Sequence, residues 1–167
     1  ISSKLETKIL SIIKNKIEFF DVIVLSDYNK GLLTNNLLKT TIELSRKKNK
    51  LVIVDPKKSD FSPYRGANII TPNFKELLEA SKIKKNLKTE DDPNMVVRLS
   101  KELLKKYSFD AIVTTRSSDG ISIVDKKNAS LHLPSKAQEV FDVSGAGDTV
   151  IAYIASGVAN GRSLFNA

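Results

Sequence analysis

The segment 142–149 reads Asp-Val-Ser-Gly-Ala-Gly-Asp-Thr and precedes the apolar residues of a predicted helix. Because Gly145 and Gly147 have no side chains, amides at the start of that helix can approach an anion closely, and the helix dipole favours negative charge there. A transferring phosphoryl group would fit beside these amides. Asp148 is then positioned to accept a proton from an attacking hydroxyl. The alternative is an ordinary tight turn in which one of the two aspartates only caps the helix.

Asn73 and Glu76 offer a second place for chemistry. They lie one helical turn apart after a short predicted strand, so an amide and a carboxylate can face the same side and hold hydrated Mg²⁺ near nucleotide phosphates. The same spacing is typical of a helix start at which Asn73 is the N-cap and Glu76 completes a capping box. The two interpretations are compatible with each other.

Hydrophobic periodicity predicts the alternating helices and strands that must position these residues. The predicted helices cover residues 5–20, 34–44 with Thr34 as N-cap, 73–81, 93–107 and 145 onward. The predicted strands cover residues 22–25, 51–54, 67–71, 111–115, 121–124 and 130–133, the last two as a hairpin. Continuous apolar strands indicate burial on both faces, hence a mainly parallel sheet flanked by helices, an α/β fold.

In such a sheet, ligands bind beyond the carboxyl ends of the strands. The residues that follow the predicted strands are polar: Ser26–Tyr28, Asp55–Lys57, Thr71–Asn73 and Thr115–Ser117. We therefore expect the functional site at this edge of the sheet.

Composition limits the classes of function. The 167 residues are 41% hydrophobic and 28% charged, which fits one soluble domain with a sizeable core. The chain has no cysteine, which excludes disulfides, thiolate metal sites and thiol redox chemistry. No apolar run is long enough to span a bilayer, so we expect a cytoplasmic protein without a membrane partner.

The formal net charge of +8 is compatible with nucleic-acid binding, an anionic substrate or a lysine-rich surface. The lysines are scattered, mostly at the predicted ends of elements. Aromatic residues are not interleaved with them, as a stacking platform for single strands requires. We interpret the charge as solvated faces and expect no nucleic-acid partner.

Segment 142–148 resembles the C-terminal signature of the ribokinase-like carbohydrate kinase family. The resemblance implies a central sheet flanked by helices and Mg²⁺-dependent phosphoryl transfer from ATP. It also implies that Asp148 is the catalytic base and that residues 145–147 form the anion hole.

Two other segments resemble elements of the same family. Asn73, Phe74, Lys75 and Glu76 match an Asn-x-x-Glu element of the nucleotide site, which implies that Glu76 holds Mg²⁺ through water. Thr115, Ser117 and Gly120 match the nucleotide-binding loop, where a threonine and small residues admit the phosphates and ribose of ATP. The family more often has glycine at the position of Ser117, and a plain strand-ending turn is the alternative for this loop.

Four further segments narrow the resemblance: Leu25–Gly31, Val54–Lys57, Phe61 with Tyr64–Ala67, and Leu131–Pro134. Together they resemble the kinase domains of bifunctional heptose 7-phosphate kinases that also carry an adenylyltransferase. This implies phosphorylation of D-glycero-D-manno-heptose 7-phosphate at O1, giving the 1,7-bisphosphate on the route to ADP-heptose and lipopolysaccharide. Lys57 could contact this anionic phosphosugar or be a solvated turn residue. Asp27 could orient a loop near the sugar or only cap a turn.

By the same resemblance we expect residues 1–167 to be part of a kinase domain, without the N-terminal sugar-binding and lid region and without the adenylyltransferase domain. These residues alone should then lack most sugar contacts and have little activity. Two alternatives stay open: another kinase of this family, acting on a hexose, phosphosugar or nucleoside, and a non-catalytic basic binding module. A homo-oligomer is compatible with the kinase interpretations.

Overall fold

The computed structural model describes residues 1–83, 92–135 and 145–167. The strands of this part form one sheet in the order β1-β2-β3-β4-β5-β6. They are β1 (Val22–Ser26), β2 (Leu51–Asp55), β3 (Ile69–Ile70), β4 (Ala111–Thr115), β5 (Ile121–Asp125) and β6 (Ser130–Leu133). β1 to β4 pair in parallel, whereas β5 pairs antiparallel with both β4 and β6. The predicted mainly parallel α/β sheet and its hairpin are confirmed.

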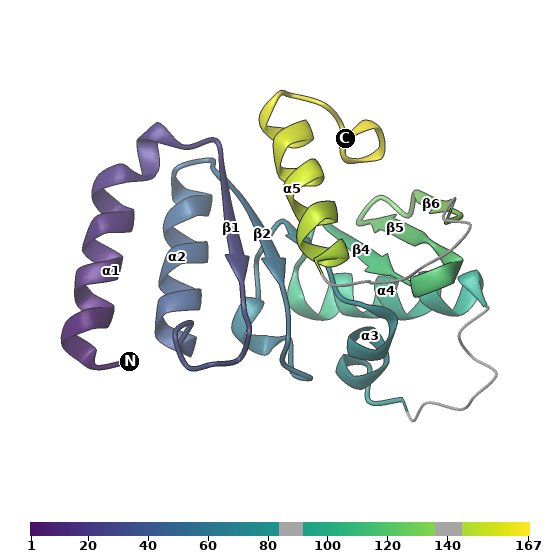
Figure 1. The fold of residues 1–167 in the computed structure, drawn as a ribbon, viewed down its shortest axis with the longest axis horizontal. Coiled ribbons are helices and arrows are strands. Elements are labelled where there is room, and N and C mark those ends of the chain that lie inside the picture. Colours follow the sequence, from purple (N-terminus) through teal and green to yellow (C-terminus); the bar gives the residue numbers. More distant parts are fainter. Residues whose placement is uncertain (84–91, 136–144) are drawn as a thin grey trace.

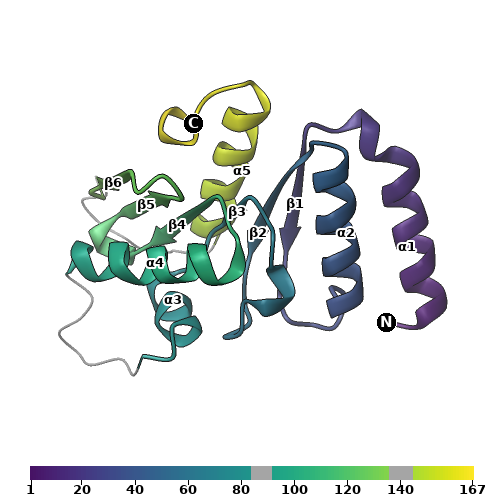
Figure 2. The ribbon, with the colours of Figure 1, turned by 180° about the vertical axis from the view of Figure 1, so that it is seen from behind.

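Helices flank this sheet on both faces (Figures 1 and 2). The α-helices of the described residues are α1 (Ser3–Lys16), α2 (Asn35–Lys47), α3 (Phe74–Ala80), α4 (Pro93–Tyr107) and α5 (Ala146–Ala159). Helices α2, α3 and α4 contribute to the core on one face, and α5 packs on the other. Helix α1 lies outside α2 and has no buried residue. In the described ranges, no helix is both long and apolar enough to cross a bilayer.

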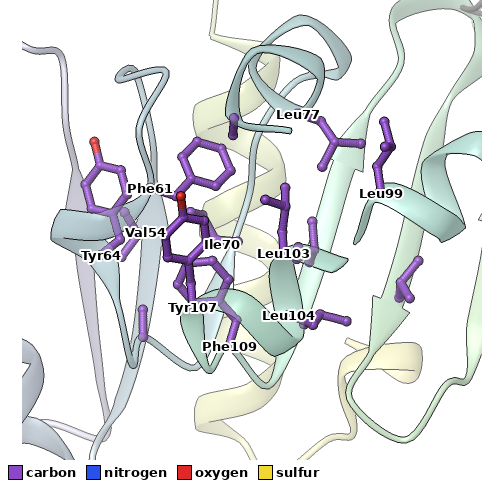
Figure 3. Packing of buried hydrophobic residues seen from close by; sticks show 14 of the residues in the cluster. Val54, Phe61, Tyr64, Ile70, Leu77, Leu99, Leu103, Leu104, Tyr107 and Phe109 are labelled. Atoms are coloured by element: carbon purple, nitrogen blue, oxygen red, sulfur yellow. The ribbon is translucent and has the colours of Figure 1, made fainter. Parts of the chain in front are cut away.

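The larger core lies between the sheet and helices α2 to α4. Since successive residues of a strand point to opposite faces, Val52 and Val54 join this core while Ile53 faces α5. Figure 3 shows the packing around Val54, Phe61, Tyr64, Ile70, Leu77, Leu99, Leu103, Leu104, Tyr107 and Phe109. Burying one such side chain contributes roughly 1.5–3 kcal/mol. This core fixes α3 and α4 against the strands whose carboxyl ends carry the predicted site.

Local sequence signals determine where two of the helices begin. The hydroxyl of Thr34 accepts a hydrogen bond from the amide of Leu37 at 3.1 Å, which confirms Thr34 as the N-cap of α2. Helix α4 begins at Pro93 with Asp92 as its N-cap. Both helices therefore start at residues suited to the first turn.

The expected burial of every strand on both faces is wrong for β1. Strand β1 is at the edge of the sheet, and Val24, on the face covered by α5, is 42% exposed. Helix α5 packs against β1 and β2, and Val22 of β1 joins its cluster as a partly buried residue, whereas Val24 stays partly exposed. An apolar run in the sequence does not distinguish an edge strand from a central one.

Two predicted elements are longer than those in the structure. Strand β3 spans only Ile69–Ile70; directly before it, the side-chain oxygen of Asn68 takes the place of a backbone oxygen and accepts the bond from the amide of Val52 at 2.9 Å. The first helix ends at Lys16, and residues 17–19 form a 3₁₀ turn that buries Ile17.

Candidate active site

The carboxyl ends of β1 to β4 and the start of α5 meet at one edge of the sheet. The amide of Asp27, after β1, donates to the carbonyl of Asp55 at the end of β2 at 3.0 Å. Asn73, after β3, forms a bridge with Thr115 at the end of β4. The hydroxyl of Tyr28 lies 3.4 Å from both carboxylate oxygens of Asp148 in α5. The structure thus brings together residues that the sequence separates by more than a hundred positions.

Helix α5 begins with open backbone amides, as the small residues predict. Its N-cap is Gly145, which has a left-handed conformation (φ 80°) and no side chain that could bond to the first amides. Within the described residues, a Cβ added at Gly145 or Gly147 would meet no atom within 4 Å, which fits the approach of an anion to these amides. Asp148 is the third residue of the helix and is exposed. Residues 142–144 of the predicted motif lie outside the described residues.

Tyr28 is the contact of Asp148 that the sequence did not predict. Its side chain is 57% exposed and reaches from the loop after β1 to the first turn of α5. A phenol can donate a hydrogen bond to a carboxylate and hold its orientation. A polar residue directly after a strand was the signal that could have identified Tyr28, but nothing in the spacing relates it to Asp148.

Lys57 bridges two carboxylates that come from different elements. Its Nζ lies 3.6 Å from Oδ1 of Asp55 and 3.2 Å from Oε1 of Glu76. The side chains of Asp55 and Glu76 are 9% and 12% exposed, whereas that of Lys57 is 38% exposed. The sequence places Asp55 directly at the end of a strand but does not single it out as a site residue.

The charges of this cluster are coupled. Burial raises the pKa of Asp55 above its usual range, Lys57 opposes that shift, and the nearby charges of Glu76 and Asp148 add to it. Burial lowers the pKa of Lys57, but the ion pairs with Asp55 and Glu76 outweigh burial and raise the pKa above its ordinary value. Lys57 therefore stays an ammonium ion at neutral pH.

Asn73 and Glu76 form the capping box that their spacing predicts. The amide of Asn73 donates to Oε2 of Glu76 at 2.8 Å, and the amide of Glu76 donates to Oδ1 of Asn73 at 2.9 Å. Phe74 is buried in the core and offers only backbone to a ligand, while Lys75 is exposed and pairs with Glu79 at 3.9 Å. With one oxygen on the capping box and the other on Lys57, Glu76 has a fixed orientation.

A cleft of about 280 Å³ lies between the start of α3 and the loop after β4. It is lined by Asn73, Phe74, Lys75, Arg116, Ser117, Ser118 and Asp119. The two segments predicted to bind a nucleotide therefore border one cavity. Thr115 ties these segments together, because the amide of Thr115 donates to the carbonyl of Pro72 at 3.1 Å.

Backbone geometry explains two residues of the loop after β4. Gly120 has φ 87°, and a Cβ there would overlap the carbonyl of Leu133 and lie 2.7 Å from the amide nitrogen of Ser135. Ser117 has φ 54°, a left-handed conformation that glycine adopts without strain. The glycine more common in the family at position 117 matches that conformation.

Arg116 stabilises the loop after β4 by hydrogen bonds to two carbonyls of that loop. It is 8% exposed; its amide donates to the carbonyl of Gly120 at 2.8 Å and its guanidinium donates to the carbonyl of Asp119 at 2.9 Å. The Nε of Arg116 is buried and has no hydrogen-bond partner among the described residues.

Asp27 is buried beneath the site and bound by protein donors. Its Oδ1 accepts from the amide of Asn29 at 2.8 Å, which is the turn cap that the sequence allows. Its Oδ2 accepts from the hydroxyl of Tyr64 at 2.8 Å and lies 3.3 Å from Nζ of Lys58. These contacts fit a residue that positions the loop after β1, and a contact between Asp27 and a sugar stays a prediction.

No cluster of three or more metal-ligating side chains occurs in residues 1–83, 92–135 and 145–167. The donor set nearest to such a site is the carboxylate pair Asp55 and Glu76, which share one cation, the ammonium of Lys57. Carboxylate oxygens suit a hard ion such as Mg²⁺, which keeps most of its water when bound. The pair therefore fits water-mediated binding of Mg²⁺.

Comparison with curated proteins gives relatives over nearly the whole chain. Three of them are named bifunctional protein HldE. The one from Campylobacter jejuni subsp. doylei is 44% identical over 98% of this chain, the one from Photobacterium profundum 43% over 95%, and the one from Rhodospirillum rubrum 41% over 94%. The chain spans about a third of the length of these relatives, namely 34%, 32% and 31%.

Solved structures share the fold at low sequence identity. A mutant of phosphofructokinase-2 from Escherichia coli superposes with a TM-score of 0.76 at 18% identity, over 93% of this chain and 50% of that one. Ribokinase from Arabidopsis thaliana, complexed with ribose and ATP, gives a TM-score of 0.70 at 18% identity, over 94% and 47%. The family model for pfkB family carbohydrate kinases matches residues 2–167. This chain belongs to the pfkB carbohydrate kinase family.

Proposed function

We propose that the protein is an ATP-dependent kinase that phosphorylates the anomeric hydroxyl of heptose 7-phosphate. The observation that carries the proposal is the position of Asp148 in the first turn of a helix whose glycine N-cap leaves the leading amides open. A base and an anion site then lie within one turn of helix, as transfer of a phosphoryl group requires.

In this mechanism Asp148 removes the proton of the sugar hydroxyl. The sugar oxygen forms a bond to the γ-phosphorus of ATP, the bond from that phosphorus to the bridging oxygen breaks, and ADP leaves. The amides of residues 145–147 stabilise the charge on the transferring phosphoryl oxygens. Tyr28, at 3.4 Å from Asp148, keeps the carboxylate oriented toward the hydroxyl.

The cleft between α3 and the loop after β4 is the proposed nucleotide site. Asn73 and Ser117 line it, Lys75 supplies a cation for a phosphate, and Thr115 and Gly120 shape the loop. Asp55 and Glu76 would hold hydrated Mg²⁺, which would neutralise charge on the phosphates of ATP.

The choice of a heptose phosphate rests on the relatives named HldE, which are 41–44% identical, and on the segments that resemble heptose 7-phosphate kinases. Lys57 is the proposed contact for an anionic group of substrate or nucleotide, because its ammonium is partly exposed beside the site. The solved phosphofructokinase-2 of Escherichia coli has a tetrameric inhibited form, and a homo-oligomer is compatible with the proposed kinase.

The test is ATP consumption by the full-length protein with heptose 7-phosphate, fructose 6-phosphate and ribose. We expect selective turnover of the heptose, and a loss of roughly 10²–10⁴-fold in kcat for Asp148→Asn, the range that a general base contributes. Asp21→Asn, which removes an exposed carboxylate before β1, is the matched control and should keep full activity. Turnover of another sugar would retain the kinase but replace the heptose, and undiminished activity of Asp148→Asn would overturn the mechanism.

A further inference from the structure

The bridge made by Lys57 leaves an unusual charge balance at the carboxyl ends of β2 and β3. One ammonium serves two nearly buried carboxylates, Asp55 at 3.6 Å and Glu76 at 3.2 Å. The charge of Asp148 also acts on Asp55 and raises its pKa. Two carboxylates therefore share one cation, so the cluster still attracts positive charge.

The three partners of the bridge differ in how firmly they are held. Glu76 is fixed by the capping box through its second oxygen, and Asp55 ends a central strand of the sheet. Lys57 follows on a loop, is 38% exposed and carries its charge on a flexible four-carbon stem. The carboxylates can therefore stay in place while the ammonium leaves.

We propose that Lys57 is an internal counter-cation that occupies the cation position between Asp55 and Glu76 until a divalent metal ion displaces it. The inference rests on the proposed function for the identity of the metal, Mg²⁺. In the nucleotide-free protein, Lys57 competes with the metal and weakens its binding. When the metal is bound, the released ammonium is free to contact an anionic group of ATP or of the phosphosugar.

The alternative role for Lys57 is to hold the carboxylates of Asp55 and Glu76 close together without competing with a metal ion. Removal of Lys57 would let Asp55 and Glu76 repel each other and move apart, and metal binding would weaken. The two roles predict opposite signs for the effect of removing Lys57, so one measurement separates them.

The experiment measures binding of Mn²⁺ alone to the nucleotide-free, full-length protein by electron paramagnetic resonance. Lys57→Met should tighten Mn²⁺ binding on the order of tenfold, because one opposing unit charge is removed from a partly buried site. Lys57→Arg keeps the charge and should not tighten Mn²⁺ binding, because the guanidinium also pairs with carboxylates. Glu76→Gln added to Lys57→Met should cancel the gain, which would locate the metal at this pair.

Lys126→Met is the matched control. Lys126 also pairs with a carboxylate, Asp110 at 2.7 Å, but it lies at the opposite end of the strands, since Asp110 precedes β4. The control removes the same charge and an ion pair of the same type, and it should leave Mn²⁺ binding unchanged. An equal gain in Lys126→Met would mean that only the net charge matters, and it would overturn the proposal.

A second measurement uses the wild-type protein and tests the proposal even where a variant fails to fold. Mn²⁺ should increase the acetylation of Lys57 by an amine-reactive reagent several-fold, measured by mass spectrometry, while Lys126 is labelled equally with and without the metal. Unchanged labelling of Lys57, or weaker Mn²⁺ binding in folded Lys57→Met, would overturn the counter-cation role. Neither measurement needs turnover of ATP, so failure of the proposed kinase activity would be seen separately.

Discussion

The nucleotide half of the candidate site, residues 73–76 and 115–120, is built differently from the base half, Tyr28 and the start of α5. In the nucleotide half, a capping box, a bridge between Asn73 and Thr115, and the buried Arg116 fix the backbone. In the base half, the exposed side chains of Tyr28 and Asp148 meet at 3.4 Å, and no atom of the described residues lies within 4 Å of a Cβ added at Gly145. The first half is formed by the fold itself, whereas the second depends on a few contacts that a substrate can change.

This comparison predicts that glycine replacements have unequal effects on stability. Gly120→Ala should destabilise the protein by about 3 kcal/mol or more, because a Cβ would overlap the carbonyl of Leu133 and approach the amide of Ser135 to 2.7 Å. Gly145→Ala should cost only about 1–2 kcal/mol, since the added Cβ meets no atom of the described residues within 4 Å and the left-handed conformation supplies the strain. Denaturant unfolding measures both free energies.

Gly161→Ala is the control that separates the cost of backbone strain from the cost of steric overlap by the added Cβ. Gly161 also has a positive φ, 77°, and open space around it, but it lies beyond the end of α5, away from the site. It should match Gly145→Ala in stability. Equal losses in all three variants would show that the nucleotide half is not held more tightly than the base half.

Most of the fold follows from local patterns in the sequence. Apolar runs separated by turn residues predict the strands, and the interval between Asn73 and Glu76 predicts the start of α3, because both signals act within one element. The partial exposure of Val24 could not be predicted, since burial of a strand depends on its place in the sheet. The short β3 could not be predicted either, since its ladder is completed by the side chain of Asn68.

The sequence predicts which residues belong to the candidate site, but not which of their side chains contact one another. Asp148, Gly145 and the capping box are local in sequence, so their types and spacing identify them. The pairing of Lys57 with Glu76 and of Tyr28 with Asp148 crosses 19 and 120 positions and depends on how loops pack at the edge of the sheet. The family resemblance implies that Gly120 binds a nucleotide. The structure gives a second reason for a glycine at this position, namely close packing against the carbonyl of Leu133 in β6.

A smaller change in the free energy of unfolding, of opposite sign, is expected at Ser117, in the same loop as Gly120. Ser117→Gly should stabilise the protein by about 0.5 kcal/mol, because the relief of a left-handed serine, φ 54°, exceeds the entropy that glycine loses on folding. The measurement is again the free energy of unfolding in denaturant. Ser118→Gly, one residue along in the same turn, is the control and should destabilise by a similar amount, since the backbone φ of Ser118 is not positive.

The smallest expected effect is a pH dependence in the hairpin that supports the nucleotide half. His132 on β6 shares a hydrogen bond of 2.8 Å with the hydroxyl of Ser122 on β5, which fits a structural role. Burial, and to a lesser degree the charge of Arg116, lowers the pKa of His132 below its ordinary value of 6.5. The native state therefore binds this proton less tightly than the unfolded chain does. The stability that His132 contributes is full above about pH 6.5 and is lost as the pH falls through the native pKa.

His132→Gln should remove this part of the pH dependence. Between pH 7 and pH 5, the wild-type protein should lose more of its free energy of unfolding than the variant, because only the wild type gains a proton at position 132 on unfolding. Thermal unfolding at a series of pH values measures the free energy of unfolding of both proteins. In the difference between them, the contributions of all other titrating groups cancel. Parallel curves for the two proteins would mean that the imidazole titrates equally in both states. The hairpin of β5 and β6 would then be as open to solvent as the base half. The firmly packed part of the nucleotide half would include Gly120 but not this hairpin.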